Sequence, residues 1–299
     1  MSGSSAEPET EAFLAYRNLL FTVAYEMLGS ATDAEDVLQE TWLQWVKANR
    51  EQVRDQRAFL IRITTRQALN RLRTIKRRRE AYVGCWLPEP LLTAPDVAED
   101  VELAESVSMA LMLVLETLSP TERAVFVLRE VFVVDYAEIA AVVGKSPAAV
   151  RQIAHRARRH VDARRPRQPA SPDEGRAVME SFRSAVATGN PQALLEVLAP
   201  QAVLTSDGGG VKHAALRPVT GAGRVARLLA GGMGRLEGTI ITTEPAVVNG
   251  NPALLVRLDG EIDGVMAIAV EDGRIAGLYY VRNPEKLSRV TSATPLTLH

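Results

Sequence analysis

The chain has 299 residues, of which 46% are hydrophobic and 24% charged, and a formal net charge of −1. This is the balance of an ordinary soluble globular protein, and the length predicts two or three domains. The single cysteine, Cys85, excludes an internal disulfide, and no apolar run approaches the roughly 20 residues of a membrane span. We therefore expect a cytoplasmic protein without a membrane segment, and we expect no metal or cofactor.

Charge is segregated along the chain, although the net charge by itself gives no support for nucleic-acid binding. Residues 56–79 hold nine basic residues and no acidic one, and residues 80–122 hold nine acidic residues and no basic one. Basic residues dominate again over 145–167, where Asp162 is the one acid. Segregation of this kind predicts local phosphate-binding surfaces, and the alternative is a set of solvated helix faces.

Residues 11–80 are expected to be helical, after a short disordered tail formed by the polar N-terminus MSGSSAEPETE. The stretch 32–35 (TDAE) has the form of a capping box and precedes a one-faced apolar stripe. That stripe consists of Val37, Leu38, Thr41, Trp42, Trp45 and Val46. The next helix is expected from near Arg57, with arginines outside and an inner face of Phe59, Leu60, Ile63, Ala68, Leu69, Leu72 and Ile75.

Residues 81–105 are predicted to be an acidic linker that contains several prolines. Its first part, YVGCWLPEP at 82–90, is extended, because prolines fix φ and remove backbone donors. A short, stiff segment loses little entropy on docking, and tryptophan is a good anchor. The alternative is a linker whose Trp86 merely covers the preceding helices. The acidic stretch 96–105 is either a partner contact, a screen for the basic blocks or a solvated spacer.

Residues 106–165 are predicted to be a second helical segment with a helix-turn-helix. Ser119 can cap a helix whose first residue is Pro120, and a glutamate follows three residues after the cap. The helix over 136–143 ends at Gly144, and Ser146 then precedes a basic helix.

The basic helix after Ser146 has two distinct faces. Its buried stripe is expected to be Val150, Ile153, Ala154, Ala157 and Val161. Arginine and glutamine on the opposite face suit base edges in the major groove, and arginine also binds phosphate.

After a second linker at 166–172 (PRQPASP), residues 174–290 are predicted to form a compact α+β unit. Two helices are expected over 174–199 and a short third over 223–230, followed by a curved antiparallel sheet. The sequences NGN at 249–251 and EDG at 271–273 predict hairpin turns. The Asp-Gly pairs at 259–260 and 263–264 are also interpreted as turns.

These segments resemble a known family. The run DAEDVLQ at 33–39 resembles the helix by which extracytoplasmic-function (group 4) sigma factors grip the clamp helices of RNA polymerase. Residues 57–79 resemble the region that melts and reads the minus-10 promoter element, with Asn70 where an aspartate is expected. Residues 118–161 resemble region 4, whose last helix reads the minus-35 element.

The resemblance implies that the partners are core RNA polymerase, through its β′ clamp helices and β flap, and promoter DNA, and that the free chain is a monomer. The implied polymerase contacts are Asp33, Asp36 and Gln39. The implied minus-10 contacts are Arg62, Arg66, Asn70, Arg71, Arg73, Lys76 and Arg77. The implied minus-35 contacts are Ser146, Arg151, Gln152, His155, Arg158 and Arg159.

Three motifs resemble the subgroup of these sigma factors that carries a fused SnoaL-like domain. They are WLPEP at 86–90, DGGGVK at 207–212, which is the subgroup's DGGGK with Val211 inserted, and NPEKL at 283–287. The subgroup pattern implies two all-α sigma domains followed by an α+β SnoaL/NTF2-like cone that contacts the sigma core and modulates its activity. The implied interdomain regulatory residues are Trp86, Leu87, Pro88, Asp207, Gly208, Gly209, Gly210, Lys212, Asn283 and Pro284.

Two other functions are weighed against a sigma factor: a ligand-responsive helix-turn-helix repressor that acts without polymerase, and an enzyme fused to a DNA-binding module. A repressor needs one reading helix, whereas this chain has two basic modules joined by a long linker. Catalysis in a cone of this fold needs a positioned carboxylate or histidine, and the candidates are Asp207, His213, Asp259 and Asp263. We expect no enzymatic activity. Binding of a small ligand in the pocket is the alternative role for this domain. Cys85 is either an oxidant sensor or a buried thiol.

Overall fold

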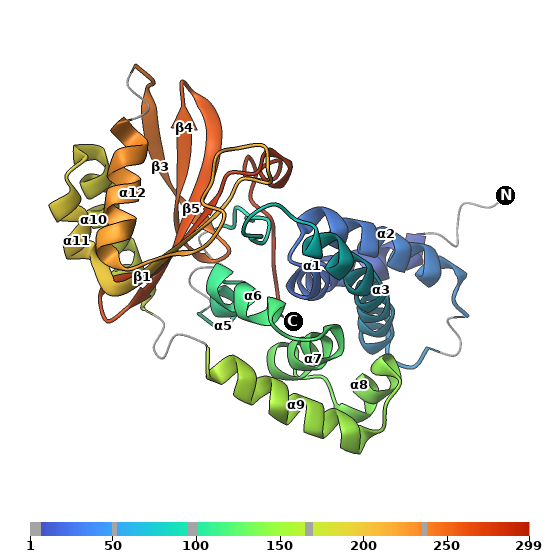
Figure 1. The fold of residues 1–299 in the computed structure, drawn as a ribbon. Helices are drawn as coiled ribbons and strands as arrows, with labels where there is room; N and C mark the ends of the chain where they lie inside the picture. Colours follow the sequence, from blue (N-terminus) through green and yellow to red (C-terminus); the bar gives the residue numbers. More distant parts are fainter. Residues whose placement is uncertain (1–6, 50–52, 95–100, 165–169, 235–237, 299) are drawn as a thin grey trace. The chain divides into compact units, whose positions relative to one another are not determined.

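The computed structural model describes residues 7–49, 53–94, 101–164, 170–234 and 238–298. It divides into two compact units, each described by itself (Figure 1). Unit 1 takes its described residues from 1–80, 114–164 and 295–299. Unit 2 takes its described residues from 81–113 and 165–294, so that it holds the linker together with the C-terminal α+β part. The predicted start of the tail at 1–6, the acidic residues 96–100 and the linker residues 166–169 lie outside the described residues.

Unit 1 begins with three helices packed against one another, α1 (Glu7–Leu28), α2 (Ala31–Lys47) and α3 (Gln56–Glu80). The polar residues 7–11, predicted to belong to a disordered tail, instead form the first turns of α1. The predicted capping box at 32–35 is also wrong. Gly29 ends the first helix at φ 66°, and Ser30 becomes the cap, accepting from the Asp33 backbone N–H at 3.1 Å.

Most of the predicted inner faces of α2 and α3 are buried, including the whole of Trp45. Two members of the predicted α2 stripe differ, because Trp42 is half-buried and Val46 is 42% exposed. The end of the chain packs on the first helix. Leu296 and Leu298 are buried, and the Thr297 backbone N–H donates to the Thr22 hydroxyl at 3.2 Å.

Four further helices lie wholly within the described part of unit 1, and the last two form the predicted helix-turn-helix. They are α7 (Pro120–Phe126), the π-helical η2 (Val127–Val131), α8 (Tyr136–Val143) and α9 (Pro147–Asp162). The capping box at Ser119 is confirmed, with Pro120 in the first turn. Gly144 ends α8 at φ 68°, a left-handed conformation that favours glycine, and Ser146 caps α9. The predicted buried stripe of α9 is confirmed at all five positions.

Unit 2 contains a six-stranded sheet in the order β2-β1-β6-β5-β4-β3. The strands are β1 (Leu198–Asp207), β2 (Val219–Thr220), β3 (Ile241–Val248), β4 (Asn251–Leu258), β5 (Glu261–Glu271) and β6 (Arg274–Val281). The predicted antiparallel sheet is wrong at one pairing, because β1 runs parallel to β6. The two strands are far apart in the chain, so no hairpin turn marks their pairing.

The turns of the sheet follow the sequence with one exception. Asn249-Gly250, Asp259-Gly260 and Asp272-Gly273 connect adjacent strands with positive φ at both residues, as tight hairpins require. The predicted turn at Asp263-Gly264 is wrong, because both residues lie inside β5 and are buried.

Helices α10 (Pro172–Thr188), α11 (Pro191–Val197) and α12 (Ala222–Gly234) cover one face of the sheet (Figure 1). Between them lies a hydrophobic core that includes Phe182, Leu194 and Leu278. A second hydrophobic cluster, with Leu87, Met109 and Val265, packs linker residues against the other sheet face. Unit 2 also holds α5 (Val101–Ser106), at the end of the linker, and the start of α6 (Met109–Glu116), which follows the linker. The expected architecture, helical domains followed by an α+β domain, is confirmed.

Candidate functional site

Asp207, at the end of β1, is the centre of a buried polar cluster in unit 2. Its side chain is fully buried. One carboxylate oxygen, Oδ2, accepts from the backbone N–H of Leu87 at 2.9 Å and from Lys286 Nζ at 2.7 Å. The other, Oδ1, accepts from the Tyr82 hydroxyl at 2.6 Å and from the Gly209 backbone N–H at 3.0 Å. A charged acceptor with four donors binds the linker to the end of the strand.

Lys286 completes the attachment of the linker. Besides its ion pair with Asp207, its Nζ donates to the carbonyl oxygen of Leu87 at 2.6 Å. The same ammonium group lies 4.3 Å from the centre of the Trp86 ring and 4.9 Å from that of Tyr82. Both backbone groups of Leu87 are therefore held by one ion pair, and the cation is stabilised by two aromatic rings.

The NPEKL segment explains how Lys286 reaches this place. Asn283 caps the single-turn 3-10 helix η3 (Pro284–Lys286), with its Oδ1 accepting from the Glu285 backbone N–H at 3.1 Å. Its Nδ2 donates to the Tyr82 hydroxyl at 2.9 Å. Burial, and then the hydrogen bond to Asp207, raises the pKa of Tyr82, so this hydroxyl stays protonated and remains a donor.

The linker makes a second attachment along β3 and its turn. The Asn249 side chain accepts from the Leu91 backbone N–H at 3.0 Å and donates to the Val107 carbonyl at 2.8 Å. Thr93 pairs through its backbone N–H with the Val247 carbonyl at 2.9 Å. Leu87 and Pro88 are buried and Trp86 is half-buried, so the predicted apolar segment lies against the α+β part of unit 2.

The glycines after Asp207 are required by the close approach of other groups. Gly209 and Gly210 have φ of 63° and 73°. A Cβ on Gly208 would lie 2.0 Å from the Lys212 carbonyl oxygen. Lys212 does not reach Asp207, and its Nζ instead pairs with Asp263 at 3.3 Å.

Asp263 is the centre of a second buried polar cluster in unit 2, and Lys212 links it to the segment after the glycines 208–210. Its carboxylate accepts from Arg282 and from the Tyr280 hydroxyl, both at 2.8 Å. Burial raises the pKa of Asp263, but these hydrogen bonds and the charge of Arg282 outweigh it and lower the pKa. The carboxylate is thus an ionised, fully engaged group rather than a general base.

We expect Gly209→Ala to lower the free energy of unfolding of unit 2 by at least about 1–2 kcal/mol, the cost of a left-handed conformation for a residue with a Cβ. The new Cβ would also lie 2.5 Å from the Asn283 side chain, which must then move. Urea unfolding measures the change. Gly231→Ala on α12, where a Cβ meets nothing within 4 Å, is the control and is expected to be neutral or slightly stabilising. Equal stability of the two variants would contradict the assignment.

In unit 1, the predicted polymerase-binding and minus-10 residues are partly joined to one another. Arg71 donates to Asp33 at 2.6 Å and to Asp36 at 2.5 Å, which ties α3 to α2. Gln39 is exposed on α2. The exposed minus-10 candidates along α3 are Arg62, Arg66, Asn70 and Arg73. The side chains of Lys76 and Arg77 lie outside the described residues.

The predicted minus-35 face of α9 lies on the surface of unit 1. Its exposed residues are Arg151, Gln152, His155, Arg158 and Arg159. Arg158 forms an ion pair with Glu130 at 2.6 Å, and Arg151 lies 5.9 Å from the ring centre of Tyr136. Ser146 accepts from the Ala149 backbone N–H at 3.2 Å, so its hydroxyl caps the helix.

A buried ion-pair network in unit 1 was not anticipated from the sequence. Glu116 at the end of α6 pairs with both Arg79 of α3 and Arg123 of α7. Arg79 also donates to the Leu28 carbonyl at 2.5 Å, and Arg123, with 2% of its side chain exposed, donates to the Glu26 carbonyl at 2.9 Å. Charges from the basic and acidic blocks thus join α1, α3 and α7.

Other chemistry finds little support in the described residues. Burial, followed by the charge of Asp207, raises the pKa of the Cys85 thiol, which disfavours the reactive thiolate that an oxidant sensor needs. Within the described ranges, no group of three or more histidine, cysteine or acidic side chains is placed to hold a metal ion. No helix in the described part of the chain is long and apolar enough to cross a membrane.

Comparisons with known proteins place these features in context. Family models for Sigma-70 region 2 and Sigma-70 region 4 match residues 12–79 and 108–161. The chain is 37% identical to the ECF RNA polymerase sigma factor SigJ of Mycobacterium tuberculosis, over 94% of this chain and 93% of the relative. It is 32% identical to the probable ECF sigma factor SigI of the same species, over 95% and 96%. The crystal structure of M. tuberculosis SigJ matches with a TM-score of 0.77 at 33% identity, covering 94% of this chain and 99% of that one.

Proposed function

The chain belongs to the extracytoplasmic-function RNA polymerase sigma factors, and from this we propose that its C-terminal domain controls promoter recognition by holding the linker at residues 82–93. Its general partners are core RNA polymerase and promoter DNA, and this is not a family of enzymes. The observation that carries the proposal is the Asp207 cluster, where one buried carboxylate binds the Leu87 backbone, Tyr82 and Lys286.

The proposed domains are region 2 at 11–80, the linker at 81–105, region 4 at 106–165 and the SnoaL-like domain at 174–290. In region 2, Asp33, Asp36 and Gln39 would contact the β′ clamp helices, while the exposed residues of α3 would contact the minus-10 element. Region 4 would lie near the β flap and present α9 to the minus-35 element. The two basic surfaces predict a steep loss of DNA affinity as salt concentration rises.

The distance between the two promoter elements supports an inhibitory effect of the docked linker. The two promoter elements lie about 25 base pairs apart by their names, which is about 85 Å along B-form DNA at 3.4 Å per pair. A free segment over 81–113 could extend to about 110 Å, whereas the docked segment packs against the sheet of unit 2 through Leu87 and Met109. Regions 2 and 4 also pack on each other within unit 1, where α3 contacts α7 and Glu116 pairs with Arg79 and Arg123. Release of the linker would therefore be one of two steps, with the opening of this contact, that let regions 2 and 4 separate far enough to read both elements.

The minus-35 assignment is tested by alanine substitution at Arg151 and at His155. Each is expected to reduce transcription from a cognate promoter about 5-fold to 100-fold, the cost of about 1–3 kcal/mol for one base contact. Binding to core polymerase should not change, because both side chains lie on the exposed face of α9. Arg274→Ala, an exposed arginine of β6, is the matched control. Loss of polymerase binding in either variant, or normal transcription in both, would contradict the assignment.

A further inference from the structure

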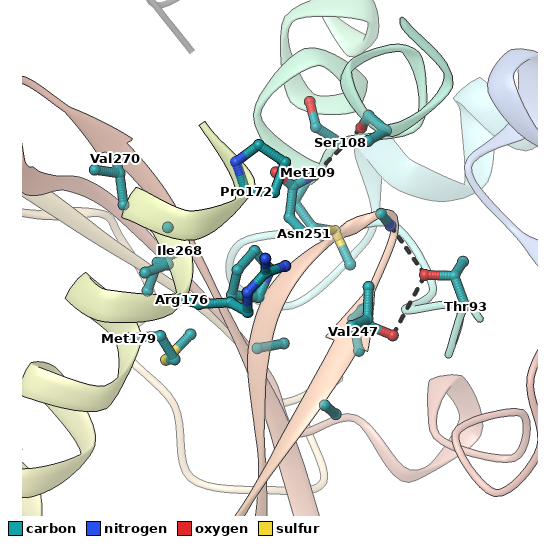
Figure 2. Close-up of a pocket in the computed structure, with 18 of the residues that line it drawn as sticks. Thr93, Ser108, Met109, Pro172, Arg176, Met179, Val247, Asn251, Ile268 and Val270 are labelled. Atoms are coloured by element: carbon teal, nitrogen blue, oxygen red, sulfur yellow. Dashed lines mark hydrogen bonds between the residues drawn. The ribbon is translucent and has the colours of Figure 1, made fainter. Parts of the chain in front are cut away.

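A cavity in unit 2 lies between the linker and the C-terminal domain. It has a volume of about 700 Å³, and linker residues around Thr93 form one of its walls together with the start of α6 around Met109. The start of α10, including Arg176 and Met179, and the end of the sheet at the turn before Asn251 form the others (Figure 2). The volume lies within the range of sites for small organic molecules, about 300–1,000 Å³.

Small side chains on facing walls keep this space open. Alanines line it from the linker, from α6, from three strands and from the segment after η3: Ala94, Ala104, Ala110, Ala246, Ala253, Ala267, Ala269 and Ala293. Protein interiors are normally packed with few voids larger than a water molecule. The cavity is partly open to solvent, so its apolar lining faces water when nothing is bound, and covering that surface with an apolar molecule is favourable.

The chemistry of the lining favours an uncharged apolar occupant. Aliphatic and thioether groups such as Met109, Met179 and Val270 dominate the described lining. The polar groups of the wall are engaged within the protein. The Thr93 hydroxyl accepts from the Gly250 backbone N–H at 3.0 Å, and Asn251 donates to the Ala104 carbonyl at 3.2 Å.

Two charged residues of the lining, Arg176 and Glu180, form ion pairs within their own helix. Arg176, whose side chain is 60% exposed, pairs with Asp173 of its own helix at 2.5 Å. Glu180 likewise pairs with Arg183 at 2.5 Å. Neither pair offers an unbalanced charge to an anionic or cationic ligand, so a charged group that lost its hydration in the cavity would not be compensated by them.

We propose that this cavity binds a neutral, largely apolar small molecule, and that its occupancy stabilises the docked linker. One wall belongs to the linker, so a ligand that contacts every wall binds the docked state more tightly than the released state. The ligand site itself is independent of the proposed function, and only its effect on transcription rests on that function. In that role the apolar molecule would be the signal that keeps the sigma factor in its restrained form.

Fluorescence titration of the full-length chain tests the site, with no polymerase or DNA present. N-phenyl-1-naphthylamine is neutral, and 8-anilinonaphthalene-1-sulfonate has the same ring framework with an added charge. We expect saturable binding of the neutral probe, at least tenfold tighter than that of the sulfonate. Absence of saturable binding, or equal or tighter binding of the sulfonate, would overturn the proposal.

Two filling variants locate the probe. Ala246→Phe on β3 and Ala110→Phe on α6 fill the cavity from two different elements, and each should weaken binding of the neutral probe at least tenfold. Thr242→Phe, an exposed position on the same strand as Ala246, is the matched control and should bind normally. Circular dichroism verifies folding, and the second variant serves if one wall does not tolerate phenylalanine. Normal binding by a folded filling variant would overturn the location.

Cleavage by the glutamate-specific protease Glu-C tests the coupling to the linker. Glu102 is exposed and Glu105 is half-buried in the cavity wall. Saturation with the neutral probe is expected to slow linker cleavage at least fivefold in the wild-type chain and not in Ala246→Phe. Unchanged cleavage of the saturated wild-type chain would refute the coupling. Neither readout involves transcription, so their failure is distinct from failure of the proposed function.

Discussion

Asp207→Asn is expected to speed amide hydrogen exchange in the linker segment 82–93 by about 100-fold or more. The substitution removes a buried charge and leaves Lys286 buried without its ion pair, which typically costs about 3–5 kcal/mol. The new amide NH₂ also faces donors in either orientation: the Leu87 N–H and the Lys286 ammonium at the position of Oδ2, or the Tyr82 hydroxyl and the Gly209 N–H at the position of Oδ1. Since about 1.4 kcal/mol corresponds to a factor of ten, the loss should appear directly in the exchange rates.

The control for this prediction is Asp272→Asn. Asp272 lies in the exposed β5–β6 turn at φ 48°, a conformation that asparagine adopts readily. Its exchange pattern over the linker should match that of the wild type. If Asp207→Asn changes linker exchange by less than threefold, the Asp207 cluster does not hold the linker.

Glu116→Gln is expected to destabilise unit 1 by about 3–5 kcal/mol, because it leaves two largely buried arginines without their carboxylate. Urea unfolding followed by the helical circular dichroism signal measures the loss. Glu138→Gln on α8, an exposed position, should change stability by less than about 0.5 kcal/mol. Wild-type stability of Glu116→Gln would show that the network contributes no net stability.

The same network predicts a pH dependence. Burial raises the pKa of Glu116, but Arg123 and Arg79 outweigh it, so the pKa in the folded state is lowered. A lowered carboxyl pKa stabilises the fold above the unfolded value of about 4.3, and this stability is lost as the pH falls through the folded value. The difference in stability between wild type and Glu116→Gln should therefore be full at pH 7 and shrink in acid. A difference that grows as the pH falls would contradict this.

Local patterns predicted much of the fold. The buried stripe of α9, the capping box at Ser119 and the end of α8 at Gly144 depend on residues within a few positions of one another. The hairpin turns at 249–250 and 272–273 are equally local. The stiffness of residues 82–90 also indicated a docking segment, and the structure places Leu87 against Asp207.

Partners distant in the chain could not be predicted from spacing. Lys286 lies 79 residues from Asp207, and no periodicity links them. For the same reason the parallel pairing of β1 with β6 was missed, and Asp263 was interpreted as a turn residue because Asp-Gly is a turn sequence. The charge blocks were visible, but their members Arg79 and Glu116 are partners in a buried pair rather than surface charges. The motif DGGGVK at 207–212 contains Lys212, but the cation that pairs with Asp207 is Lys286.

The central claim is that docking of the linker on the C-terminal domain restrains this sigma factor. Run-off transcription with core RNA polymerase, on a promoter that the chain controls, tests it most directly by comparing wild type, Asp207→Asn and Asp272→Asn. Polymerase binding is measured in parallel and should be equal for all three. We predict at least fivefold more transcript from Asp207→Asn than from the other two. Equal or lower output from Asp207→Asn, with normal polymerase binding, would contradict the claim.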